Sequence, residues 1–297
     1  MITTAPGLRA WVLLACGVCA CSTAVIFIKA THTPPIWLAA QRLLLATLIL
    51  LPFARRTAGH EGMPVGWGKA ALIPGLFLAL HFSAWSTGAR MIPAANSTLI
   101  ANLTPLAMPV VALLLLRERT STRDLVATAI GLMGVGILAA GDLDTGSGHL
   151  LGDAVCLAAM VCLAIYLALS RRLRTGSLVL YVTPLYAAAG LACAGAALIV
   201  EGIPPLPDLL EALLVAGLAS VPTLIGHTLM NRAMGEIRPQ AVSVAALGTV
   251  PLAGLIAWIL WRETPTPAFW VAAATCLIAI ALVLVPSRRR AVAPAVT

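Results

Sequence analysis

Apolar residues run along almost the whole chain in stretches of about twenty, separated by short polar or turn-forming segments. A hydrocarbon core about 30 Å thick is crossed by about 20 mainly apolar residues in a helix. Each stretch therefore predicts a transmembrane helix, and the breaks between them carry turn residues such as Thr33-Pro34-Pro35. The predicted spans are 10–28, 35–53, 70–88, 93–116, 124–141, 150–169, 178–200, 211–230, 239–261 and 268–286.

The first stretch allows a second interpretation, as a cleaved signal. Leu13-Leu14-Ala15-Cys16 faintly resembles a lipoprotein cleavage site. The apolar run continues past Cys16 to Ile28, which is longer than the usual apolar region of a signal peptide. Because nine further spans follow, an uncleaved first helix is favoured.

The composition supports a membrane protein. Apolar residues make up 60% of the chain and charged residues 10%, against about 45–50% and about 25% in soluble domains. The net charge is +8, but the basic residues form short clusters between apolar runs and lack interleaved aromatic residues. This pattern disfavours nucleic acid as a partner. The predicted partner is a lipid bilayer.

The basic residues also predict an orientation. If the N-terminus lies in the cytoplasm and ten spans alternate, fifteen of the nineteen Lys and Arg residues are cytoplasmic. Only Lys29, Arg90 and Arg262 fall outside, and Arg42 lies within a span. Cytoplasmic loops are enriched in Lys and Arg, so we expect a multi-pass protein of the cytoplasmic (inner) membrane with both termini inside.

The two halves of the chain resemble each other at an offset of 146 residues. Each half would hold five helices, and because five is an odd number the second half would be inverted in the membrane. The predicted fold is an all-α membrane protein with ten transmembrane helices in two inverted five-helix repeats, covering 1–145 and 146–297. The matching pairs are His81/His227, Pro93/Pro239, Ala95/Ala241, Ser97/Ser243, Pro105/Pro251, Leu106/Leu252, Ala107/Ala253 and, after a one-residue gap, Arg117-Glu118/Arg262-Glu263.

Several motifs resemble a known family. Trp85-Ser86-Thr87-Gly88-Ala89-Arg90, Leu103-Thr104-Pro105-Leu106 and the glycine-rich run from Gly131 to Gly136 are similar to the EamA-type repeat of the drug/metabolite transporter superfamily. The second copy has Trp261-Arg262-Glu263 but lacks the glycine-rich run. The resemblance implies a ten-helix bundle with a central cavity lined mainly by helices 1, 3, 4, 6, 8 and 9. It leaves the substrate open among amino acids, nucleosides, sugars, carboxylates and drugs.

Polar side chains inside spans are costly and are therefore candidate substrate-binding residues. Arg42 could contact an anionic substrate group, or it could be structural, reaching the outer interface or helix-end carbonyls. His81 and Trp85 are four residues apart on one helix face. They could stack on a substrate, and the histidine could couple transport to a proton. The alternative for both is ordinary helix packing.

The other candidate site residues are Asn102, Tyr166 and His227, the last of which lies nearer the cytoplasmic end. Pro105 and Pro251 remove backbone donors and free the carbonyls of Ala101 and Leu247. Together with Gly248 they are candidate hinges, and a static kink is the alternative.

Motifs for other activities are missing from the sequence. It contains no nucleotide-binding loop and no protease motif, so we expect no enzyme activity and no cofactor. The seven cysteines lie in apolar stretches and predict packing rather than a disulfide framework or a metal site. Glu118, Glu263 and Asp153 are placed at helix ends, and the absence of a deep carboxylate disfavours exchange of protons for cationic drugs.

The resulting prediction is a secondary transporter that moves a small polar metabolite by alternating access. An amino acid or related compound is the favoured small-molecule substrate, export is the favoured direction, and a proton is a candidate coupling ion. The protein would be a monomer or homodimer. The alternatives are a multidrug exporter of the same fold and a membrane sensor or enzyme that transports nothing.

Overall fold

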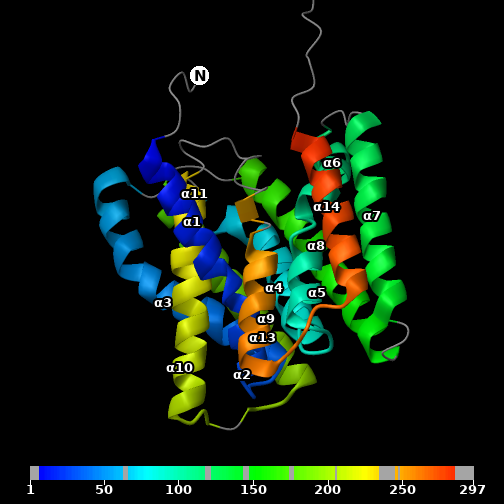
Figure 1. Cartoon of the computed structure of the whole chain (residues 1–297). Helices are drawn as coiled ribbons and strands as arrows, with labels where there is room; N and C mark the ends of the chain where they lie inside the picture. Colours follow the sequence, from blue (N-terminus) through cyan, green and yellow to red (C-terminus); the bar gives the residue numbers. More distant parts are fainter. Residues whose placement is uncertain are drawn as a thin grey trace, which may run out of the picture.

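The computed structural model describes residues 7–62, 66–117, 122–142, 147–173, 177–204, 206–233, 245–246 and 248–284, and these residues form helices and short connections (Figure 1). Helical residues occur in each of the ten ranges predicted from the sequence, as far as those ranges are described, although several ranges hold two or three separate elements. The elements are α1 (Leu8–Ser22), α2 (Ala24–Ala30), α3 (Pro35–Glu61), α4 (Lys69–Gly88), α5 (Ala94–Ala101), α6 (Thr104–Val111), η1 (Ala112–Leu116), α7 (Thr122–Asp142), α8 (Ser147–Leu173), α9 (Leu178–Val200), α10 (Leu209–Leu218), η3 (Ala219–Gly226), α11 (His227–Ala233), α13 (Thr249–Trp261) and α14 (Pro267–Leu284).

Length and composition suit these helices to a bilayer. Within the described residues, six helical segments are long and apolar enough to cross a membrane, and three shorter apolar helices accompany them. Many large apolar side chains point outward, among them Leu114, Ile199 and Leu213. Exposed apolar surface of this extent is typical of a lipid-facing surface. The six segments are Leu8–Ala30, Pro35–Glu61, Lys69–Gly88, His149–Ser170, Leu178–Val200 and Leu209–Met230.

Two helices extend beyond their predicted ends. Helix α3 continues to Glu61, through polar residues that carry no apolar signal, and α8 begins at Ser147. Asp153 consequently lies inside α8, where it is buried. Its placement at a helix end was therefore wrong, because the helix starts among the glycine and serine residues that we had assigned to the connecting loop.

Several helices are broken inside the apolar region. Thr23 separates α1 from α2, and Asn102 and Leu103 separate α5 from α6. The hydroxyl of Thr104 donates to the carbonyl of Ala101 at 3.1 Å, the carbonyl that Pro105 was predicted to free. The break thus satisfies a group that would otherwise be costly to bury. Leu247, the corresponding residue of the second half, lies outside the described residues.

Glycines allow some of these elements to approach closely. A Cβ at Gly226 would lie 2.6 Å from Cys21 Sγ and 3.1 Å from its backbone nitrogen, and a Cβ at Gly17 would lie 3.1 Å from the backbone nitrogen of Met230. Helix α1 therefore packs backbone to backbone against η3 and α11, which lie beside it in Figure 1. Small residues promote such approach between membrane helices.

The ends of two helices share an unusual backbone conformation. Arg117 follows η1 with φ 56°, and Arg262 follows α13 with φ 59°. Positive φ is uncommon for residues other than glycine. The sequence alignment of the two halves pairs these arginines, so the structure gives the paired residues the same local geometry.

Candidate substrate site and the closed lower end

Arg42 is the largest fully buried side chain of the described residues and projects from α3. Its Nε and Nη2 atoms donate to Thr223 Oγ1 at 3.1 and 2.7 Å. The guanidinium carbon also lies 4.0 Å from the centre of the Phe82 ring on α4, a cation–π geometry. Arg42 thus joins α3, α4 and η3 in the interior.

Proline chemistry places the threonine that receives Arg42. Pro222 has no backbone N–H, so it cannot donate to the carbonyl of Leu218, four residues earlier. The i→i+5 pattern of the π-helical turn offers that carbonyl the backbone N–H of Thr223, and the Thr223 hydroxyl also donates to it, at 2.7 Å. Its oxygen lone pairs then remain free to accept from Arg42. The π-helical turn η3 therefore presents a single hydroxyl that serves both the backbone and the buried arginine.

Aromatic rings continue from Arg42 along α4. The centres of the Phe82 and His81 rings are 4.8 Å apart, and those of His81 and Trp85 are 6.1 Å apart with nearly parallel planes. His81 and Trp85 thus lie one above the other on the same helix face, and their stacking on a substrate stays a prediction. His81 Nδ1 lies 2.9 Å from the carbonyl oxygen of Ala159 on α8. Since a carbonyl only accepts, Nδ1 carries the hydrogen and Nε2 is left as an acceptor in the neutral ring.

Two buried donors in this region have no acceptor. Arg42 Nη1 and Trp85 Nε1 are both inaccessible and make no hydrogen bond. Buried polar groups in proteins are normally paired, so these two are exceptions that need a physical explanation. Arg42 belongs to α3 and Trp85 to α4, and the rings of Phe82 and His81 lie between them.

The remaining predicted site residues are placed differently. Asn102 donates through its side-chain amide to Thr98 and to the Thr249 hydroxyl, at 2.8 and 3.0 Å, so it links the break after α5 to the start of α13. Tyr166 of α8 is half-buried against the apolar core. His227 begins α11 and its side chain is exposed.

The candidate hinge residues lie at helix boundaries. Pro105 follows the break between α5 and α6, and Pro251 stands in the first turn of α13. Gly248 precedes that helix, and a Cβ there would come within 3.3 Å of Val18 on α1. Their role as hinges stays a prediction.

Sequence reasoning missed two residues of this cluster. Thr223 and Phe82 contact Arg42 directly. A proline followed by threonine inside an apolar span was the available signal for Thr223. Phe82 looks like an ordinary apolar core residue until the helices are placed side by side.

Carboxylates hold the lower end of the bundle as drawn in Figure 1, where α2 meets α3 and α9 meets α10. Helix α3 starts at two prolines and has no side-chain cap. The Glu201 carboxylate at the end of α9 accepts from the backbone N–H groups of Ile36 and Trp37, at 2.9 and 3.0 Å. A negative charge is favourable at a helix N-terminus, so Glu201 caps a helix that cannot cap itself.

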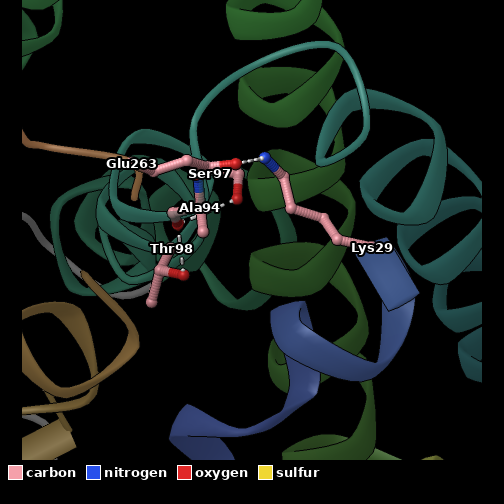
Figure 2. Close-up of polar contacts among 5 residues, drawn as sticks. All are labelled: Lys29, Ala94, Ser97, Thr98 and Glu263. Carbon is pink, nitrogen blue, oxygen red and sulfur yellow. Dashed lines mark hydrogen bonds and ion pairs between the residues drawn. The ribbon is translucent and has the colours of Figure 1, made fainter. Parts of the chain in front are cut away.

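Glu211 and Glu263 repeat this arrangement. Glu211 of α10 accepts from the backbone of His32 and Thr33 and from the Thr33 hydroxyl. Figure 2 shows Glu263 between Lys29 of α2 and the start of α5. One carboxylate oxygen pairs with Lys29 Nζ at 2.6 Å, and the other accepts from the Ala94 N–H at 2.8 Å.

Glu263 provides a direct test of this closure. Replacing it with alanine is expected to speed amide hydrogen exchange in residues 92–98 by about tenfold or more, because hydrogen bonds to charged groups contribute about 1.5–3 kcal/mol. Mass spectrometry of the exchanged peptides measures the effect. Glu61→Ala is the control, since Glu61 is exposed at the end of α3. Unchanged exchange at 92–98 in Glu263→Ala would show that the contact does not hold this end closed.

Helices of this length, an apolar outer surface and buried polar residues in broken helices define a multi-pass membrane protein of the transporter type. The family model described as the EamA-like transporter family matches residues 9–140 and again 150–285. The chain belongs to the EamA-like transporter family.

Solved structures support the same fold. One crystal structure of a protein matches with a TM-score of 0.62 and 19% sequence identity, over 94% of this chain and 98% of that chain. At that identity the likeness concerns the fold alone. A search of curated proteins finds no match to the chain.

Proposed function

We propose that the protein is a secondary transporter that moves a small polar metabolite across the cytoplasmic membrane by alternating access. An amino acid or related compound is the favoured substrate and export the favoured direction. In this proposal ten spans form two inverted five-helix repeats, 1–145 and 146–297, both termini lie in the cytoplasm, and the lower end in Figure 1 faces outward. Membership of the EamA-like transporter family supports transport as the activity.

The observation that carries the proposal is the contact between the two sequence halves at the lower end. All three carboxylates there come from the second half, and their acceptor atoms hold backbone and side-chain donors of the first half. These contacts are hydrogen bonds and one ion pair, which can be exchanged for water without exposing a packed apolar interface. Elsewhere the two halves pack closely, α3 on α9 and α4 on α8, so in this proposal the opening that alternating access requires is confined to the polar contacts at the lower end.

The broken helices supply a place for the substrate. Discontinuous membrane helices usually surround transporter binding sites because their free backbone groups need polar partners. Helix α1 packs against η3, α11 and α13, and α5 packs against α13. Arg42 contacts η3 through Thr223; Arg42, His81 and Trp85 are the proposed binding residues, with Asn102, Tyr166 and His227 as further candidates.

Transport in proteoliposomes tests the proposal. Purified protein should exchange external labelled solute for internal unlabelled solute when amino acids, nucleosides, sugars and organic acids are compared. His81→Ala is expected to lower the rate several-fold while the protein still inserts, because it removes the ring that joins Phe82 to Trp85 and the bond to α8. Wild-type rates for His81→Ala across pH 5–8 would contradict a role for this histidine, including coupling to a proton.

A multidrug exporter of the same fold is the main competing function. Resistance to cationic dyes on overexpression, without flux of any metabolite, would favour it. Absence of flux for every solute would instead favour a sensor or enzyme built on the same bundle.

A further inference from the structure

We infer that Arg42 is the receptor for a carboxylate group of the transported solute, an inference that rests on the proposed transport function and narrows its substrate class. The argument concerns the geometry of one guanidinium group. Arg42 is 1% exposed, and no Asp or Glu among the described residues pairs with it. A buried charge without a counter-ion is unfavourable, so the site is incomplete as it stands.

The hydrogen bonds of Arg42 leave one side of the guanidinium free. Nε and Nη2 share the Thr223 hydroxyl oxygen on the side edge of the planar group. Nη1 has no partner at all. The two terminal nitrogens together form the fork that fits both oxygens of a carboxylate in parallel hydrogen bonds. Thr223 therefore orients the arginine and leaves its carboxylate-binding edge buried and without a full set of acceptors.

The surrounding side chains suit an anion with an apolar body. The guanidinium rests on the Phe82 ring, which meets the His81 ring at a tilt, and His81 stacks on Trp85, whose indole N–H is the second buried donor without an acceptor. None of these groups is negatively charged. A ligand that brings acceptor atoms and an apolar part would satisfy the donors and cover the rings.

A comparison with Arg90 separates a binding arginine from a structural one. Arg90 lies between α4 and α5. Its Nε donates to the Ile28 carbonyl at 3.0 Å, and its Nη2 donates to the Thr31 hydroxyl at 2.8 Å. Those acceptors at the end of α2 depend on it. Removing Arg90 leaves the Ile28 carbonyl with only the longer, 3.4 Å bond from the Thr31 hydroxyl and removes the guanidinium that bonds Thr31, whereas removing Arg42 removes a charge without a counter-ion among the described residues.

The first measurement is thermal stability of the purified, full-length protein without ligand. Arg42→Met is expected to melt at the wild-type temperature or above it, and Arg90→Met clearly below it. Replacing a residue that serves binding at the expense of stability leaves the melting temperature unchanged or raises it. If Arg42→Met melts as far below wild type as Arg90→Met, Arg42 is a structural residue and the inference is wrong.

The second measurement uses matched acids and amides. Wild-type protein is heated with each of the twenty amino acids, with 2-oxo acids and with short mono- and dicarboxylates, alongside amides such as L-leucinamide for L-leucine. At least one carboxylate should raise the melting temperature, its amide should not, and Arg42→Met should lose at least tenfold in apparent affinity for it. Equal shifts from acid and amide, a shift retained in Arg42→Met, or no carboxylate-specific shift would each overturn the inference.

The flux assay distinguishes failure of the carboxylate site from failure of the proposed transport function. Exchange of a nucleoside or sugar at equal rates in wild type and Arg42→Met would leave transport intact and refute the carboxylate site. Absence of flux for every solute, with carboxylate binding retained, would refute transport but not the site.

Discussion

Replacing Gly190 with valine is expected to destabilise the protein by about 1–3 kcal/mol, the usual cost of overpacking a filled interior. Gly190 lies on α9 where this helix crosses α3. A Cβ at this position would stand 2.8 Å from Leu44 Cγ, 2.9 Å from its Cδ2 and 3.1 Å from its backbone nitrogen. Side-chain rotation can relieve the first two contacts but not the last, so the helices must separate.

The same helix supplies a matched control. Gly195 is exposed, and a Cβ built on it meets nothing within 4 Å. Gly195→Val carries the same change in helix propensity without the clash and is expected to stay within about 0.5 kcal/mol of wild type. Thermal melting in detergent compares the two variants, with Gly190→Ala expected between them. Equal melting temperatures for Gly190→Val and Gly195→Val would mean that α3 and α9 do not pack as described.

The positions of the helices could be predicted because the bilayer imposes a length and a hydrophobicity that the sequence must meet. The errors occur where that constraint ends. Residues 54–61 of α3 are polar yet helical, and α8 begins three residues before its predicted span. In both places the helix continues outside the apolar region, where helical and looped segments have similar composition. Because α8 begins at Ser147, Asp153 lies inside the helix rather than at its end, and its side chain is buried.

The candidate site could be predicted only in part. Arg42, His81 and Trp85 stood out because polar groups inside spans are costly, and Arg42 and His81 are hydrogen-bonded in the buried cluster with Trp85 beside them. The partners of Arg42 could not be predicted, since Thr223 lies 181 residues away. The same holds for Glu263, which hydropathy places in a loop but which bonds Lys29 across 234 residues. Such pairings depend on how helices are arranged in space, and no local pattern encodes them.

Thr223→Val is expected to have the second large effect, a loss of stability of about 2–3 kcal/mol. Valine keeps the shape of threonine but removes the hydroxyl. The Leu218 carbonyl then loses one of its donors, and Arg42 loses the acceptor shared by Nε and Nη2. Leaving a buried polar partner unsatisfied costs about 1–3 kcal/mol, and more when the group is charged. Thr223→Ser retains the hydroxyl and should remain close to wild type.

A second buried threonine shows what the hydroxyl alone contributes. Thr183 on α9 is equally buried, but its hydroxyl only donates to the Val179 carbonyl one turn earlier in the same helix. Such local bonds add little to a helix, so Thr183→Val is expected to melt near the wild-type temperature. A loss in Thr183→Val as large as in Thr223→Val would attribute the effect to threonine in a membrane helix rather than to the contact with Arg42.

The double variant Arg42→Met with Thr223→Val separates the two bonds of the Thr223 hydroxyl. If most of the loss in Thr223→Val comes from the arginine left without an acceptor, removing the arginine should restore stability, and the two substitutions will be strongly non-additive. If most of it comes from the Leu218 carbonyl, the double variant will be as unstable as Thr223→Val alone. The first outcome is expected, because an unpaired charge is costlier to bury than a carbonyl. It would also mean that the charge is retained for binding, since the bundle is at least as stable without it.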